Sequence, residues 1–180
     1  ITAGNALVVR GANGSGKTTL LRILAGLTRA EQGTIDWRGQ RVEPYAQALR
    51  DDLAFIGHAP ALKDELTARE NLASLAMLAA DDATPQRVAD ALAAVGLAAQ
   101  MTLPARVLSQ GQRRRVHLAQ LALTTRPLWI LDEPTTALDS QGLAWLEAAL
   151  SRHLTSGGVA VLATHTPLAL AADRVTEIAL

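Results

Sequence analysis

Residues 11–19 have the types and spacing of a phosphate-binding loop. They read Gly-Ala-Asn-Gly-Ser-Gly-Lys-Thr-Thr and match the pattern G-x-x-x-x-G-K-[ST]. Glycines let backbone N–H groups converge on a triphosphate, and the N-terminus of a following helix favours the same anion. Lys17 can reach the β- and γ-phosphates, and the Thr18 hydroxyl can bind Mg²⁺. The predicted nucleotide contacts are Gly11, Asn13, Gly14, Ser15, Gly16, Lys17, Thr18 and Thr19.

Two acids, Asp132 and Glu133, directly follow the apolar run of residues 128–131. Such a run is typical of a buried parallel strand, and parallel sheets bind ligands at the carboxyl ends of their strands. We expect Asp132 to hold Mg²⁺, directly or through water, and Glu133 to polarise the water that attacks the γ-phosphate. Two acids at the end of a strand can also be merely solvated, but the phosphate loop in the same chain favours the catalytic interpretation.

The pentapeptide Leu-Ser-Gln-Gly-Gln at residues 108–112 presents a serine hydroxyl and glycine-exposed N–H groups at a predicted helix start. A helix start of this kind can bind an anion. Taken alone, the segment is better explained as a helix cap, because Ser109 and Gln112 have the spacing of a capping box. One triphosphate needs only one phosphate loop, so a second such element favours ATP bound between two copies of the chain.

The composition indicates a folded chain with no strong affinity for polyanions. Hydrophobic residues make up 49% and charged residues 19% of the 180 residues, which excludes a disordered chain. Lys plus Arg and Asp plus Glu number 17 each, so we expect no nucleic-acid partner. The basic cluster Arg113–Arg115 is predicted to be a solvated helix face. No apolar run approaches the ~20 residues that span a bilayer, so a membrane role would come through a partner.

Strand patterns alternate with helix patterns along the chain, which predicts a mostly parallel sheet with right-handed crossovers. The predicted strands are 6–10, 53–58, 128–131, 159–164 and, at an edge, 175–180, with a hairpin over 33–42. The predicted helices begin near residues 19, 68, 85 and 109, the last reaching about 124, and another helix contains Leu143, Leu146 and Leu150. The Ala/Leu-rich block 61–107 is expected to be a helical subdomain, leaving 1–60 and 108–180 as the ATP-binding α/β core.

The order of these motifs resembles the nucleotide-binding domain of ABC transporters, and Leu-Ser-Gln-Gly-Gln is similar to that family's signature motif. The resemblance implies an α/β P-loop NTPase of ABC type. It also leads us to expect further N-terminal strands, because only one strand precedes the loop. It implies a head-to-tail dimer in which each ATP lies between residues 11–19 of one copy and Ser109, Gly111 and Gln112 of the other.

Three further residues take roles from this resemblance. Asp139 is expected to be the inter-subunit loop acid, although it can also cap a helix. His165 is expected to be the switch histidine that contacts the γ-phosphate, and with Glu133 and Lys17 it completes the predicted catalytic set. His58 stands where the family usually has a glutamine that senses Mg²⁺ and the attacking water. The alternative for His58 is an ordinary histidine of a surface loop.

A narrower resemblance is carried by residues 56–63, 66–72 and 128–134. These segments resemble the ATP-binding subunit of the cytochrome c maturation haem exporter. That family has a histidine at the position of His58. This narrower resemblance implies a peripheral ATPase on the cytoplasmic face of the cell membrane. Its cofactors would be ATP and Mg²⁺, and its partners a second copy and integral membrane transporter subunits. The alternatives are a subunit of a different transporter, a soluble ABC-type ATPase acting on ribosomes or DNA, or a module that binds ATP without hydrolysing it.

Overall fold

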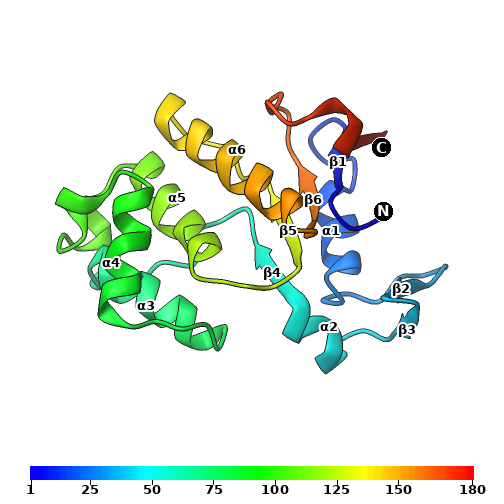
Figure 1. Cartoon of the computed structure of the whole chain (residues 1–180), viewed down its shortest axis with the longest axis horizontal. Helices are drawn as coiled ribbons and strands as arrows, with labels where there is room; N and C mark the ends of the chain where they lie inside the picture. The colour runs from blue at the N-terminus through cyan, green and yellow to red at the C-terminus, as the bar shows by residue number, and fades with distance from the viewer. The chain divides into compact units, whose positions relative to one another are not determined.

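The computed structural model describes all 180 residues, and their contacts divide them into two units (Figure 1). The first, here called the sheet unit, comprises Ile1–Gly57, Arg126–Glu133 and Arg152–Leu180. The second, here called the helical unit, comprises His58–Thr125 and Pro134–Ser151. Contacts therefore group residues 108–125 and 134–151 with the helical block. The sequence predicted a helical subdomain over 61–107 and an ATP-binding core over 1–60 and 108–180, and this division stays a prediction.

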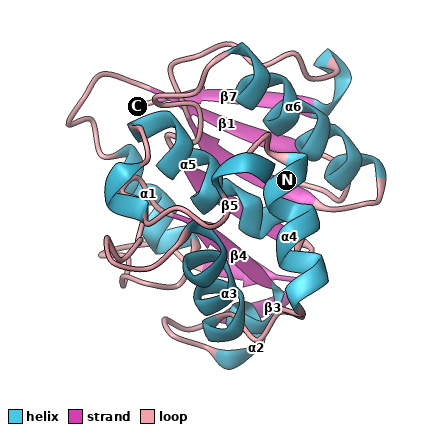
Figure 2. Ribbon diagram, turned by 90° about the vertical axis from the view of Figure 1, so that its left-hand side faces the viewer, coloured by secondary structure: helices cyan, strands magenta, loops and turns pink.

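Five parallel strands form the main sheet of the sheet unit, in the order β4-β5-β6-β1-β7 (Figure 2). The strands are β1 (Ala6–Arg10), β4 (Leu53–Ile56), β5 (Leu128–Asp132), β6 (Val159–Ala163) and β7 (Val175–Ala179). Every residue of β5 and β6 is buried, as expected for central strands covered on both faces. The parallel α/β sheet and the edge position of β7 confirm the predicted fold class.

Helix α1 (Lys17–Leu24) follows β1 after the glycine-rich loop and packs Leu21 into the core of the sheet unit, with Ile130 and Val161 of the sheet. Trp129, on β5, is buried and stacks on His153 with ring centroids 3.9 Å apart. Because β1 pairs with β6 and runs directly into the loop of residues 11–16, this loop lies at the carboxyl end of the sheet, next to β6.

The predicted hairpin is present as β2 (Ile35–Trp37) and β3 (Gln40–Val42), joined by a two-residue turn. Both turn residues, Arg38 and Gly39, have positive φ (53° and 76°), which suits the right-handed twist of a hairpin. The indole N–H of Trp37 donates to Asp52 Oδ2 across 2.8 Å. Asp52 ends helix α2 (Gln47–Asp52), a six-residue helix that the sequence did not predict.

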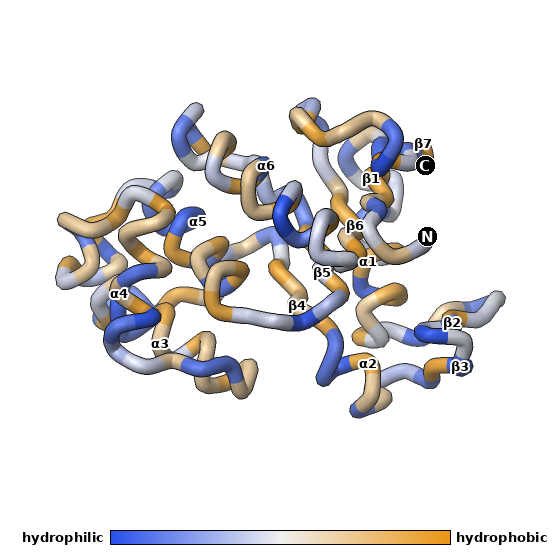
Figure 3. Tube along the Cα trace, in the orientation of Figure 1, coloured by the Kyte–Doolittle hydropathy of each residue, from blue (hydrophilic) through white to orange (hydrophobic).

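The helical unit contains α3 (Ala68–Leu78), α4 (Pro85–Ala94), α5 (Gln110–Leu118) and most of α6 (Ser140–Thr155), and hydrophobic and hydrophilic residues alternate along its helices (Figure 3). The side chains of Thr67, Thr84 and Ser109 each cap the helix that follows, and these helices begin close to the predicted residues 68, 85 and 109. The core of this unit includes Leu72, Val88, Leu92, Val116 and Leu123. None of the helices in the chain has both the length and the apolar character needed to cross a membrane.

Helix α5 is shorter than predicted. It ends at Leu118, and a 3₁₀ turn (Ala119–Ala122) continues it, whereas the sequence favoured one helix to about Thr124. The side-chain amide of Gln120 donates to the backbone oxygen of His117 across 2.9 Å, so this carbonyl has a side-chain partner near the point where the α-helical geometry stops. Three further short 3₁₀ segments occur at Ala98–Gln100, Ala105–Val107 and Ala172–Arg174.

Candidate functional site

The glycine-rich loop joins β1 to α1 and curls around its own lysine. Gly14 and Gly16 have positive φ (85° and 100°), and Gly16 is the N-cap of α1, so side chains at these two positions would strain the loop. The Lys17 side chain folds back, and its Nζ donates to the backbone oxygens of Gly11 (2.8 Å) and Ala12 (3.0 Å). These contacts hold a buried ammonium, with 7% of the residue exposed, over the loop.

The hydroxyl of Ser15 is buried in the same loop and has no hydrogen-bond partner in the chain. A buried hydroxyl without a partner is uncommon and calls for an explanation such as an absent ligand. An anion bound in the loop would accept from this hydroxyl and from the neighbouring N–H groups at the start of α1. The loop therefore has the donors that a phosphate group requires.

Thr18 and Asp132 lie side by side. The hydroxyl of Thr18, in the first turn of α1, donates to Asp132 Oδ2 across 2.9 Å. Asp132 is the last residue of β5 and is 2% exposed. The chain holds no cluster of three or more His, Cys, Asp or Glu side chains that could bind a metal by themselves. Two adjacent oxygen ligands instead suit Mg²⁺, which keeps several waters and takes its other ligands from phosphate.

Glu133 and His165 meet at the carboxyl ends of neighbouring strands. Nε2 of His165 lies 3.3 Å from Oε1 of Glu133, with the two side chains 50% and 15% exposed, respectively. Glu133 follows β5 with a positive φ of 47°, and its N–H donates to Ala163 O at the end of β6 (2.8 Å). The pairing of β5 with β6 explains how two residues far apart in sequence come into contact. The sheet unit thus brings together five predicted site residues: Lys17, Thr18, Asp132, Glu133 and His165.

The Leu-Ser-Gln-Gly-Gln segment lies at the N-terminus of α5 in the helical unit. The Ser109 hydroxyl accepts from the N–H of Gln112 (3.2 Å), and the Gln112 side chain accepts from the N–H of Ser109 (2.9 Å). This reciprocal pair is the capping box that the sequence allowed as an alternative. The Ser109 hydroxyl keeps its own hydrogen for a further acceptor, so capping and ligand binding are compatible.

Gly111, within this segment, has no space for a side chain. A Cβ atom at Gly111 would lie 2.6 Å from the backbone oxygen of Ala137. Nearby, Asp139 accepts from the N–H of Gly142 (2.9 Å) at the start of α6 and from Arg115 Nη2 (3.2 Å). Asp139 is therefore a helix cap, as the sequence allowed, and it also links α6 to α5.

The prediction that Arg113–Arg115 forms a solvated helix face is wrong. Arg114 is only 2% exposed, and its Nη1 donates to the backbone oxygen of His58 across 3.1 Å. The side chains of Arg113 and Arg115 are 25% and 12% exposed, and both are ion-paired. The arginines are buried because backbone carbonyls and acids distant in sequence accept their hydrogen bonds, and a local pattern does not reveal these acceptors.

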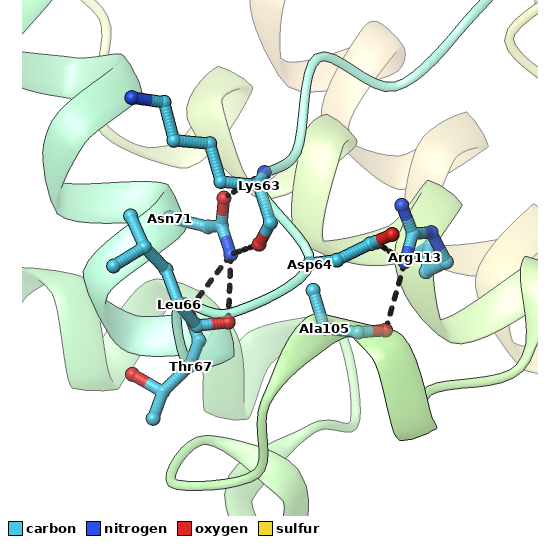
Figure 4. Close-up of polar contacts among 7 residues, drawn as sticks. All are labelled: Lys63, Asp64, Leu66, Thr67, Asn71, Ala105 and Arg113. Atoms are coloured by element: carbon cyan, nitrogen blue, oxygen red, sulfur yellow. Dashed lines mark hydrogen bonds and ion pairs between the residues drawn. The ribbon is translucent and has the colours of Figure 1, made fainter.

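His58 is exposed and lines a cavity of about 360 Å³ in the helical unit, together with Pro60, Gln110, Arg114 and Ala137. The loop that follows His58 is held by side chains of α3 and α5 (Figure 4). The Asn71 amide accepts from Lys63 N (2.8 Å) and donates to the backbone oxygens of residues 63, 66 and 67 (3.0–3.1 Å). Arg113 Nη1 donates to Asp64 Oδ1 (2.6 Å) and to Ala105 O (2.9 Å).

Sequence reasoning missed the anchoring residues of the helical unit. Asn71 is 2% exposed on α3, next to the buried stripe of Ala68, Leu72 and Ala76. An amide at the apolar face of an amphipathic helix is a signal that could have identified it, because buried polar side chains are normally hydrogen-bonded. The sequence offered no comparable signal for Arg113 or Arg114.

Comparisons with known proteins show the family to which the chain belongs. The family model described as "ABC transporter" matches residues 1–136. The chain is 51% identical over 165 residues to the cytochrome c biogenesis ATP-binding export protein CcmA of Cupriavidus necator, covering 92% of this chain and 73% of the relative. It is 45% identical over 180 residues to the protein of the same name from Dechloromonas aromatica, covering 100% of this chain and 88% of the relative.

Two solved structures have the same fold. An ATP-binding subunit of an ABC transporter is 27% identical with a TM-score of 0.77, over 91% of this chain and 69% of the other. A dimeric ATP-binding cassette in a post-hydrolysis state, bound to ADP and phosphate, is 26% identical with a TM-score of 0.77, over 92% of this chain and 77% of the other. The chain belongs to the ABC transporter family, as an ATP-binding domain related to the cytochrome c biogenesis export proteins.

Proposed function

We propose that this chain is the ATP-hydrolysing subunit that powers an export step of cytochrome c biogenesis, with haem or an intermediate of haem delivery as the cargo. The observation that carries the ATPase part is the placement of Lys17, Thr18, Asp132, Glu133 and His165 at the carboxyl ends of three adjacent strands. The export part rests on the names of its relatives.

Binding begins at the glycine-rich loop. The proposed contacts are the backbone N–H groups of residues 11–19 and the side chains of Asn13, Ser15, Lys17 and Thr19. Lys17 exchanges the carbonyls of Gly11 and Ala12 for the β- and γ-phosphates, which are stronger acceptors because they are charged. The buried hydroxyl of Ser15 gains the acceptor that the chain itself does not provide.

Thr18 and Asp132 are the residues that would hold Mg²⁺. When bound, the ion neutralises charge on the phosphate oxygens. The existing hydrogen bond between the two side chains already brings both oxygens to the same place, so little rearrangement is needed. Asp132 is held by the buried strand β5, so its carboxylate loses little conformational entropy when it binds the ion.

Glu133 is the proposed general base. Its carboxylate accepts a proton from the attacking water while the water oxygen bonds to the γ-phosphorus and the bond to the β-phosphate oxygen breaks. His165 contacts this carboxylate in the structure, so its ring N–H can orient Glu133, or it can turn to a phosphate oxygen once ATP is bound. The positive φ of Glu133 turns the chain directly after β5.

A second copy of the chain is the proposed partner across ATP. Its Ser109, Gly111 and Gln112 would cover the triphosphate, and its Asp139 would contact the facing glycine-rich loop, giving a head-to-tail dimer. The remaining hydrogen of the Ser109 hydroxyl and the position of the segment at the N-terminus of α5 support this role. His58 is the proposed sensor of the nucleotide state, because it faces a cavity and its backbone is held by Arg114.

We further propose integral membrane transporter subunits as partners and the cytoplasmic face of the cell membrane as the location. The balanced charge of 17 basic and 17 acidic residues argues against a site on ribosomes or DNA. The test is to express the complete tagged protein in its own host and to identify what co-purifies from gently solubilised membranes. Recovery of polytopic cytochrome c assembly proteins supports the proposal. Recovery of a different permease contradicts the cargo, and recovery with ribosomes or DNA contradicts the membrane role.

A further inference from the structure

The segment that carries His165 is irregular and begins at the buried residue Thr164. It follows β6, and residues 164–171 form no helix or strand. The His165 side chain is 50% exposed, so the core does not determine its direction. The direction of such a side chain depends on how the backbone on either side of it is held.

Arg10 holds this backbone on both sides of His165. Its Nη1 donates to the backbone oxygen of Thr164 across 2.8 Å and to that of Thr166 across 3.3 Å. A second bond within the segment, from Thr166 N to Thr164 Oγ1 (3.1 Å), closes the turn around His165. The two carbonyls that flank His165 in sequence therefore share one nitrogen of one guanidinium.

The other side of the guanidinium is fixed by β7. Arg10 Nη2 donates to Glu177 Oε1 across 2.8 Å. Arg10 pairs with Ala179 in the β1–β7 register, and Glu177 lies two residues before Ala179, so both side chains are on the same face of the sheet. The Arg10 hydrogen bond also lowers the pKa of Glu177.

Arg10 also stands directly before the glycine-rich loop. It is the last residue of β1, and Gly11 follows it. One residue therefore connects the start of the phosphate-binding loop to the turn that carries the histidine. A planar guanidinium suits this position, because its rigid fork can serve several acceptors at once.

We propose that Arg10 is a positioning residue for His165. By binding the carbonyls of Thr164 and Thr166, it directs the imidazole towards Glu133 and fixes the position of the ring relative to the glycine-rich loop. The inference rests on the proposed role of His165 in hydrolysis. It assigns no contact between Arg10 and ATP, so Arg10 acts on turnover through His165 and leaves nucleotide affinity largely unchanged.

The first test compares ATP hydrolysis and ATP affinity in Arg10→Met and in Glu177→Gln. Arg10→Met keeps the aliphatic stem and removes all donors, and we expect kcat to fall about tenfold to a hundredfold with KM within about twofold. Glu177→Gln is the matched control: it removes the ion pair and keeps both carbonyl contacts, so kcat should stay within about twofold. Arg10→Lys, which keeps donors for the carbonyls, should recover part of the loss. A loss that appears in KM alone, or equally in both variants, overturns the proposal.

The second test is a double-mutant cycle with His165→Ala, read by single-turnover hydrolysis. Arg10→Met should add no further loss in the His165→Ala background, whereas independent, multiplicative losses overturn the positioning role. If His165→Ala alone hydrolyses ATP at the normal rate, the proposed role of His165 fails instead.

The NMR signals of the His165 ring, assigned by their loss in His165→Ala, give a readout that does not depend on activity. They should move towards those of a free histidine in Arg10→Met and stay in place in Glu177→Gln. Unchanged ring signals in a folded Arg10→Met protein overturn the proposal.

Discussion

The Thr18 hydroxyl donates a hydrogen bond to Asp132 Oδ2 across 2.9 Å, although 114 residues separate the two. This contact joins the first turn of α1 to the end of β5, and it brings a hydroxyl oxygen and a carboxylate oxygen together at the carboxyl end of the sheet. The two side chains have the chemistry of Mg²⁺ ligands, and the neighbouring Glu133–His165 contact lies at the end of the same strand.

Removing the Thr18 hydroxyl should impair the use of Mg²⁺. In Thr18→Val, the side-chain volume is kept but one ligand is lost, so we expect ATP hydrolysis at limiting Mg²⁺ to fall at least about tenfold. The Mg²⁺ concentration that gives half-maximal activity should rise. Titrating the ATPase rate with Mg²⁺ measures both effects. Thr176→Val, the same substitution at an exposed position of β7, is the control and should behave like the unmodified protein. Equal Mg²⁺ titrations in both variants would contradict the assignment.

Asn71 should be important for the stability of the helical unit. Asn71→Ala leaves the N–H and C=O of Lys63 and the C=O of Leu66 without their side-chain partner, so we expect the free energy of unfolding to fall by about 2–3 kcal/mol. Urea denaturation measures this change. Ser74→Ala, at an exposed position of the same helix, should change stability by less than about 0.5 kcal/mol. Similar unfolding midpoints for the two variants would show that the loop does not depend on Asn71.

His117 should make stability depend on pH. Burial, and secondarily the charge of Arg114, lowers the pKa of His117 from 6.5 to about 4. Arg114 Nη1 lies 3.4 Å from His117 Nδ1, and since a guanidinium only donates, Nδ1 accepts and the ring is neutral. Between pH 6.5 and about 4 the unfolded chain therefore binds more protons than the folded chain, and stability decreases as the pH falls.

The expected loss from His117 over that range is about 3 kcal/mol, from the shift in pKa and ~1.4 kcal/mol per unit. His117→Asn removes the titrating ring and should flatten the slope of unfolding free energy against pH. Part of the slope should remain, because burial also lowers the pKa of His153. Urea unfolding at several pH values between 4 and 7 provides the measurement, and an unchanged slope in the variant would rule out His117 as its source.

Local patterns predicted most of the elements that position the site. The apolar run of residues 128–131 followed by two acids is the signal of a buried strand that ends at a site. In the glycine-rich loop, the signal is the set of glycines before a lysine. The contacts of Thr18 with Asp132 and of Glu133 with His165 then follow from strand order, since β5, β6 and β1 are adjacent.

Long-range polar contacts could not be predicted in the same way. Arg10 and Arg114 look like ordinary basic residues until the fold brings the carbonyls of Thr164 and His58 to them, 154 and 56 residues away in sequence. Helix α2 was missed because it has six residues, begins after Ala46 without a side-chain cap and buries only Leu49. Its stability comes from tertiary packing, which a local window does not contain.

The central claim is that this domain hydrolyses ATP with Glu133 as the base, and single-turnover hydrolysis by Glu133→Gln tests it most directly. The variant keeps the side-chain shape and loses the proton acceptor. We predict a rate at least about a hundredfold lower with ATP affinity retained, and an ATP-bound dimer that persists in size-exclusion chromatography. Hydrolysis at the normal rate in Glu133→Gln would contradict the account and remove Glu133 from the reaction.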